Sequence, residues 1–89
     1  MKKVQVLDLS SFDTKNVTDM SYMFSESVAL KTIYASEKFV TTNVTDSTYI
    51  FNHVPSLVGG NGTKYDNSND DITYARIDTA TTPGYFTKK

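Results

Sequence analysis

The sequence contains one histidine, His53, so any serine-hydrolase site in this chain would have to use it as the general base. Ser56 and Asp46 lie nearby in the sequence and could act as the nucleophile and the orienting acid. However, no nucleophile elbow or comparable motif surrounds them. We therefore interpret His53 as a surface-loop residue, and we expect no catalytic residue and no enzyme activity.

The acidic and amide side chains of Asp66–Asp71 could bind a metal ion, because calcium prefers clustered oxygen ligands. An EF-hand loop beginning at Asp66 would need glycine at its sixth position and glutamate at its twelfth, but these residues are Asp71 and Ile77. A solvated acidic turn fits better, with a looser calcium site as the alternative. The chain has no cysteine, which excludes disulfides and thiolate ligands. We expect no metal and no cofactor.

Two further patterns suggest chemistry only superficially. The glycine-rich stretch Gly59–Lys64 lacks the spacing of a phosphate-binding loop. Three N-x-T glycosylation sequons begin at Asn16, Asn43 and Asn61, but the first two asparagines are better explained as helix caps.

Charge and hydropathy exclude several classes of partner. The net charge is -1, and no cluster of lysine and arginine is dense enough for nucleic acid or an anionic membrane. Residues 1–3 could open a signal peptide, but Gln5 and Asp8 interrupt the apolar stretch that follows, so we predict that this is not a secretion signal. No apolar run approaches transmembrane length.

The strongest feature of the sequence is an internal repeat. With an offset of 27, nine residues fall on identical ones: Phe12, Thr14, Asn16, Val17, Thr18, Asp19, Tyr22, Phe24 and Leu30. Upstream of this block the offset is 26, so that Leu7 matches Ile33. We predict two repeats, at about 4–29 and 30–58.

The repeat predicts its own secondary structure. Residues 4–9 and 30–35 have the L-x-x-L-x-L spacing of a leucine-rich repeat strand. Apolar residues at helical spacing then predict short helices over 17–24 and 44–51. Each helix would be capped by an asparagine and an acidic residue three positions later, which are Asn16 with Asp19 and Asn43 with Asp46.

The repeat is lost after residue 58, and we predict a capping segment over 59–89. A third strand begins at Leu57-Val58, and Gly59–Gly62 stops it after two residues. Residues 64–71 are polar and predict a loop, whereas 72–78 fit either a short helix or a strand. The apolar pair Tyr85-Phe86 should pack back onto the last repeat.

One pair of repeated side chains is a candidate binding site. On a helical wheel Tyr22 falls opposite the apolar side of its predicted helix, and Tyr49 repeats this arrangement. The two tyrosines should therefore lie one repeat apart on the outer face. They could form a structural ladder between neighbouring elements or an aromatic contact strip for a partner.

The motif LDLSSFDTKNVTDMSYMF resembles the BspA-like leucine-rich repeat surface proteins, whose core pattern matches Asn16–Phe24. The closing stretch after Leu57 resembles the end segment of the same family and explains its glycines as a strand end. Glu26-Ser27 and His53-Val54 depart from the family, which usually has Gly-Cys there. The resemblance implies bacterial cell-surface or secreted proteins, adhesion to host matrix or to other bacteria, and no enzyme activity.

We therefore predict an α/β repeat fold: a short leucine-rich-repeat solenoid with one parallel strand and one short helix per repeat, plus a C-terminal cap. The expected function is a non-catalytic interaction or adhesion face on a bacterial surface or secreted protein, whose partner would be a host matrix protein or another bacterial surface protein. The alternative is a structural spacer and end cap of a longer solenoid. We expect no nucleic-acid or membrane contact by this segment, and weak self-association through the uncapped strand at residues 4–9.

Overall fold

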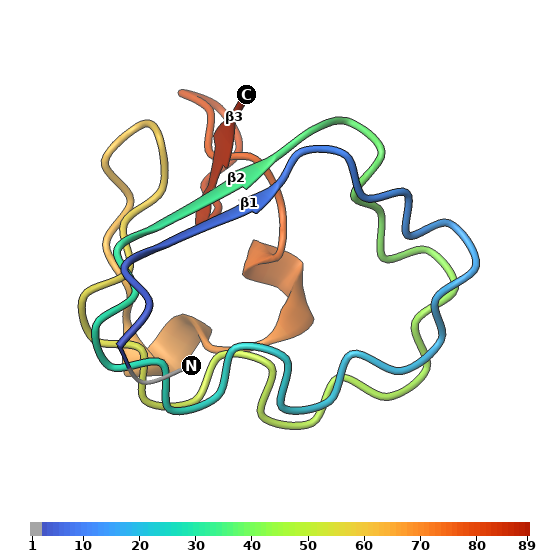
Figure 1. The fold of residues 1–89 in the computed structure, drawn as a ribbon, viewed down its shortest axis with the longest axis horizontal. Helices are drawn as coiled ribbons and strands as arrows, with labels where there is room; N and C mark the ends of the chain where they lie inside the picture. Colours follow the sequence, from blue (N-terminus) through green and yellow to red (C-terminus); the bar gives the residue numbers. More distant parts are fainter. Residues whose placement is uncertain (1–2) are drawn as a thin grey trace.

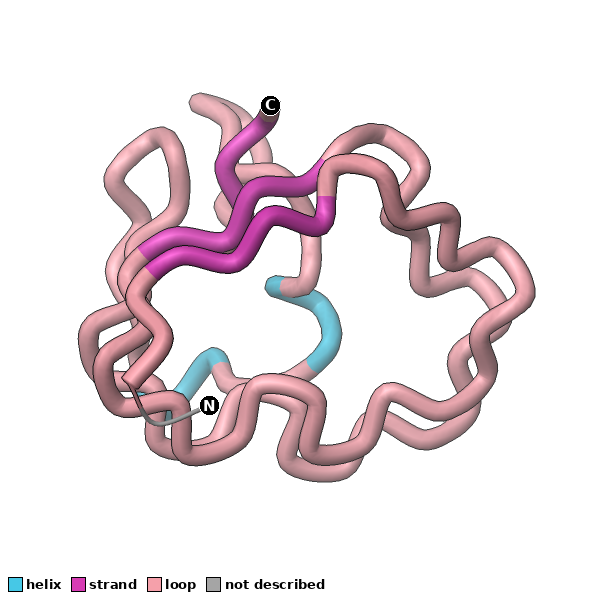
Figure 2. Tube along the Cα trace, viewed as in Figure 1, coloured by secondary structure: helices cyan, strands magenta, loops and turns pink. Residues whose placement is uncertain are grey.

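The computed structural model describes residues 3–89 and contains two stacked coils followed by a cap (Figure 1). Coil 1 (residues 4–29) and coil 2 (residues 30–58) follow nearly the same path side by side, and most of each is loop and turn (Figure 2). Residues 1 and 2, which belong to the segment considered above as the possible start of a signal peptide, lie outside the described part. None of the helices in residues 3–89 is long and apolar enough to cross a membrane.

One strand from each level forms a three-stranded parallel sheet in the order β1-β2-β3. The strands are β1 (Val6–Leu9), β2 (Thr32–Ala35) and β3 (Phe86–Lys88). Leu7 lies opposite Ile33, which reproduces the 26-residue offset of the repeat. Side chains alternate between the core and the outer surface, as pleated strands require. The two predicted repeat strands are confirmed.

The predicted helices over 17–24 and 44–51 are wrong, because both segments are series of tight turns. Tyr22 and Tyr49 have φ angles of 57° and 53°, in the left-handed region that a right-handed helix cannot include. Alternate N–H groups of this part of coil 1 point instead at coil 2. Met20, Tyr22 and Phe24 donate to the carbonyl oxygens of Asp46, Thr48 and Ile50 over 2.8, 2.8 and 3.0 Å. Amides used between coils in this way are not available for helical bonds within a coil.

The core lies inside the coils, where equivalent repeat positions stack. Phe24 and Phe51 pack with ring centroids 5.3 Å apart and planes 13° from parallel. Leu30 and Leu57 are fully buried at the next shared position. Burying a phenylalanine or leucine contributes about 2–3 kcal/mol. Because these side chains are buried against neighbouring coils, the stacking of the coils stabilises the fold more than any single coil does.

The C-terminus completes the third level of the sheet. Leu57-Val58 does not continue into a full strand. The Val58 N–H donates to the Lys31 carbonyl over 3.0 Å, and the chain then leaves the stack. β3 takes the vacant place beside β2. Tyr85 and Phe86 are fully buried, which confirms that this pair packs against the last repeat.

The cap contains the helical turns of the described residues. They are two 3-10 turns, η1 (Asn67–Asn69) and η2 (Ile72–Tyr74), and both lie outside the segments predicted as helices in the two repeats. η1 lies within the predicted loop over 64–71. η2 shows that 72–78 starts as a single helical turn, after which Ile77 forms a parallel bridge to Phe86.

A buried carboxylate, Asp78, holds the cap together. Its oxygens accept hydrogen bonds from the backbone N–H groups of Asn61 and Thr63, from the Thr63 hydroxyl at 2.7 Å, and from the Gly84 N–H. Burial alone would raise the pKa of Asp78, but these donors outweigh it and lower the pKa below its usual value. A Cβ on Gly59 would lie 2.2 Å from the Gly84 carbonyl and 2.6 Å from the Asp78 carboxylate. Gly59, which begins the glycine-rich stretch compared above with a phosphate-binding loop, is therefore needed because the backbone packs closely there.

Candidate functional site

Tyr22 and Tyr49 form a paired aromatic patch on the outer surface. Their ring centroids are 5.5 Å apart, with the planes tilted by 55°. They are 58% and 56% exposed, whereas Phe24 and Phe51, two residues further along each coil, are buried. The predicted outward position of the tyrosines is therefore found, although a turn and not a helix produces it.

The backbone of the neighbouring coil fixes the tyrosine patch. The Tyr22 N–H donates to the Thr48 carbonyl over 2.8 Å, so the left-handed turn at Tyr22 is anchored directly beside Tyr49. A left-handed conformation costs a non-glycine residue about 1–2 kcal/mol. Both coils carry this cost at the same repeat position, and contacts between the coils compensate for it.

The predicted helix caps have other roles, because there are no helices to cap. The Asp19 carboxylate accepts from the N–H and the hydroxyl of Ser21 at 2.9 and 2.6 Å, and Asp46 does the same with Thr48 at 3.1 and 2.8 Å. The hydroxyl of Ser21, followed by its N–H, lowers the pKa of Asp19. These are Asx turns, and the sequence signal for them is an aspartate followed two residues later by serine or threonine.

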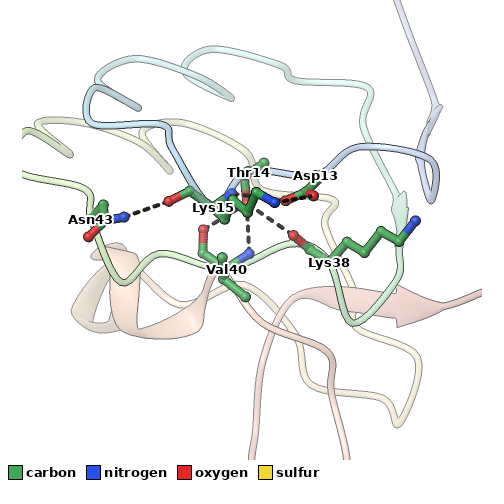
Figure 3. Close-up of polar contacts among 6 residues, drawn as sticks. All are labelled: Asp13, Thr14, Lys15, Lys38, Val40 and Asn43. Carbon is green, nitrogen blue, oxygen red and sulfur yellow. Dashed lines mark hydrogen bonds and ion pairs between the residues drawn. The ribbon is translucent and has the colours of Figure 1, made fainter.

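The two asparagines also differ from the prediction. The Asn43 side-chain amide donates to the carbonyl of Lys15 over 2.6 Å, which ties coil 2 to coil 1 (Figure 3). Asn16 is the equivalent residue in coil 1, and within residues 3–89 no coil lies on its other side to accept such a bond. Asn43 is thus a link between the coils, and neither asparagine caps a helix.

Thr14 is a further link between the coils that the sequence analysis missed. Its buried hydroxyl donates to the Val40 carbonyl and accepts from the Val40 N–H, both at 2.7 Å (Figure 3). The Thr14 N–H donates to the Lys38 carbonyl over 3.2 Å. The available signal was that Thr14 is identical to Thr41 in the next repeat.

His53 is exposed and lies in a turn with a φ of 58°, as expected for a surface loop. It lines an open groove of about 740 Å³ that also includes Glu26 of coil 1 and Tyr65 and Asp66 of the cap. Ser56 and Asp46, the other members of the hypothetical triad, do not line this groove.

The acidic turn at Asp66–Asp71 is occupied with local hydrogen bonds. Asp66 accepts from the Ser68 N–H at 2.8 Å and caps η1, and Asp71 accepts from the Thr73 N–H at 3.1 Å and caps η2. Over the described range 3–89, the structure contains no group of three or more His, Cys, Asp or Glu side chains that could hold a metal ion. The arrangement of this turn is suited to starting the cap's two short helical turns.

The outer surface of the sheet carries one ion pair that spans it. The Lys89 ammonium lies 2.6 Å from the Asp8 carboxylate on β1 and 5.3 Å from the ring centroid of Tyr34 on β2. The hydrogen bond from Lys89, followed by those from Ser10, lowers the pKa of Asp8 well below its usual range. Since both groups are exposed, solvent screens the pair.

Comparison with known proteins gives a family and no function. No curated protein and no solved structure matches the sequence. The sequence does match the family model described as "Mycoplasma protein of unknown function, DUF285" over residues 2–82, which includes both coils and most of the cap. The description of this family does not mention BspA-like proteins, so that resemblance stays a prediction. The chain therefore belongs to the DUF285 family.

Proposed function

We propose that this chain is a non-catalytic repeat module of a bacterial cell-surface or secreted protein, and that its exposed tyrosine patch contacts a partner protein. The observation that carries the proposal is the pair Tyr22 and Tyr49, which are each more than half exposed and whose tilted rings contact each other outside the coils. Tyrosine is enriched at protein interfaces because a rigid ring offers apolar area with a polar tip. The family description names Mycoplasma, which supports a bacterial source.

The leading partner class is a host matrix protein, with another bacterial surface protein as the second. A direct test immobilises collagen or fibronectin and measures binding of the 89-residue chain by surface plasmon resonance. Changing both tyrosines to alanine (Tyr22→Ala with Tyr49→Ala) should weaken binding at least tenfold, because interface tyrosines often contribute more than about 1 kcal/mol each. The matched control, Tyr22→Phe with Tyr49→Phe, keeps both rings and should retain most of the binding.

A structural spacer is the alternative, and the contact between the two rings favours it. Their 5.5 Å separation is that of an interacting aromatic pair, which contributes about 0.5–1.5 kcal/mol. Under the spacer hypothesis the alanine pair lowers the free energy of unfolding by that amount and leaves binding unchanged. Alanine keeps the Cβ, so the left-handed backbone cost is the same before and after substitution. Thermal unfolding measured beside the binding assay separates the two functions.

A further inference from the structure

The groove next to His53 is built from the repeat itself. Glu26 and Val28 of coil 1 line it, and the equivalent positions of coil 2, His53 and Pro55, continue it. The cap closes the third level with Tyr65–Asn67. The groove of about 740 Å³ therefore runs along the stack and crosses all three levels of the molecule.

Two of its side chains sit where the backbone favours glycine. Glu26 and His53 have φ angles of 59° and 58°. Glycine adopts this conformation without a steric penalty, whereas other residues incur about 1–2 kcal/mol. The chain thus holds a functional group at a costly position in each coil, and both groups line the same groove. A backbone outlier of this kind points to a role for the side chain.

The groove combines acidic groups with an apolar surface. Glu26 and Asp66 contribute carboxylates, whereas Val28, Pro55 and Tyr65 contribute apolar and aromatic surface, and no lysine or arginine is among the lining residues. Such a lining fits an organic cation with an apolar stem. A metal ion fits less well, because the carboxylates and the imidazole do not converge into a group of three ligands in residues 3–89.

Tyr65 gives the groove a rigid wall. Its hydroxyl donates to the Phe51 carbonyl over 2.6 Å, and its ring packs 5.6 Å from that of the buried Tyr85. Burial, followed by the charges of Asp70 and Asp66, raises the pKa of Tyr65 above its usual value. The negative charge that opposes ionisation of this tyrosine would attract a cation to the same place.

We propose that this groove binds a basic segment of a partner protein, with an arginine side chain lying along Tyr65 and its guanidinium directed to Glu26 and Asp66. Arginine suits the site better than lysine, because its planar guanidinium both stacks on aromatic rings and pairs with carboxylates. The side-chain methylenes cover Val28 and Pro55. This second interface does not depend on the tyrosine patch of the proposed function.

The test uses a fluorescein-labelled peptide of alternating Gly-Ser and Arg residues, titrated into the 89-residue chain at low salt. Its partner peptide has citrulline, a neutral isostere, in place of arginine. We expect saturable binding of the arginine peptide alone, with amide NMR shifts that centre on Val28, Tyr65 and Asn67. Glu26→Gln and Asp66→Asn should each weaken binding about two- to fivefold, the range of a partly exposed ion pair. Asp66→Asn keeps the oxygen that accepts from Ser68, so η1 should remain capped.

Two variants distinguish a binding role from a structural one. Glu37→Gln removes the same charge from an exposed site outside the groove and should leave peptide affinity unchanged. Glu26→Gly relieves the left-handed backbone, so it should raise the midpoint of thermal unfolding while it weakens peptide binding. Equal binding of the citrulline peptide, or unchanged affinity in Glu26→Gln, would overturn the proposal. Retained peptide binding in the chain with Tyr22→Ala and Tyr49→Ala would show that this interface stands apart from the tyrosine patch.

Discussion

The two ends of the coil stack use the same repeat but differ in how they are covered. Phe12 of coil 1 and Phe39 of coil 2 occupy equivalent positions, yet Phe12 is 48% exposed and Phe39 only 8%. The reason is Phe86 of the cap, whose ring meets that of Phe39 edge-on with centroids 4.8 Å apart. The environment of a repeat residue therefore depends on what covers it at the next level as well as on its own coil.

The backbone shows the same difference. At the closed end, which the cap covers, β3 pairs with β2 along one edge. Along its other edge, the Phe86 carbonyl accepts from the Asp78 N–H over 2.9 Å. At the open end, β1 pairs with β2 on one side only among residues 3–89. In a solenoid this asymmetry concentrates stability in the capped levels.

The largest expected effect comes from making the same substitution at both ends. Phe39→Ala should lower the free energy of unfolding by about 3 kcal/mol, because it opens a cavity against Phe86. Phe12→Ala should cost less than about 1 kcal/mol, since its ring is half exposed. Urea denaturation monitored by circular dichroism measures both values. Equal losses would show that the cap does not create the difference between the ends.

The second largest effect is expected from removing the buried negative charge of Asp78 in the cap. Asp78→Asn should cost about 2 kcal/mol at pH 7, the range for hydrogen bonds to a charged group. The pKa of Asp78 is lowered in the folded chain, so its stabilisation is present above the ordinary aspartate pKa and is lost as the pH falls through the folded value.

The wild-type chain and Asp78→Asn should therefore differ most near neutral pH. Their free energies of unfolding should converge as the pH is lowered below about 4. Urea titrations across this range provide the measurement. A difference that stays constant down to pH 2 would mean that the carboxylate charge contributes nothing to the cap.

The strands could be predicted from sequence, whereas the helices could not, for a physical reason. Residues 4–9 and 30–35 have the L-x-x-L-x-L spacing, which predicts a strand, and Leu7 and Ile33 pair in the sheet as the repeat requires. Val17, Met20 and Phe24 recur every three or four residues, which suits a helix but equally suits a coil that turns a corner at the same interval. The deciding factor is a set of hydrogen bonds to a segment 26 residues away, which a local pattern does not contain.

The candidate site divides in the same way. The outward direction of Tyr22 and Tyr49 was predicted from a helical wheel, and both side chains are exposed although 17–24 and 44–51 are turns. Their alignment followed from the repeat, because any regular stack places equivalent residues in a row. The groove could not be predicted, because it joins turns of two coils to a cap that shares no repeat with them. The left-handed backbone at Glu26 and His53 had one signal in the sequence. Both residues stand where the BspA-like pattern usually has glycine.

A smaller effect is expected from a substitution in the core of coil 1, the coil at the uncovered end of the stack. Ser27 of coil 1 is buried and its hydroxyl has no hydrogen-bond partner, whereas the equivalent residue of coil 2 is the buried Val54. Ser27→Val should raise the free energy of unfolding by about 1 kcal/mol, because it removes an unsatisfied polar group. The reverse exchange, Val54→Ser, should destabilise the chain. A stability loss in Ser27→Val, measured by urea denaturation, would indicate that the larger side chain does not fit coil 1.

The smallest expected effect is association through the open end. The carbonyls of Asp46, Thr48 and Ile50 in coil 2 accept hydrogen bonds from N–H groups of coil 1. The equivalent carbonyls in coil 1, those of Asp19, Ser21 and Met23, accept no backbone hydrogen bond from residues 3–89. Beside them lies a shallow hollow of about 290 Å³ lined in part by Phe12 and Met20. Unpaired backbone next to apolar surface favours edge-to-edge association.

We therefore expect a weak two-fold dimer in which the β1 edges of two copies meet. Val6 on β1 is 54% exposed, so a charge there would face the partner copy without disturbing the core. Val6→Lys places two like charges near the dimer axis and should abolish the association, whereas Val28→Lys, at a comparably exposed valine outside β1, should not. Sedimentation equilibrium from micromolar to millimolar concentration measures the mass of all three chains. If the wild-type chain stays monomeric throughout, the exposed edge of β1 does not drive assembly, and the open and closed ends differ in stability alone.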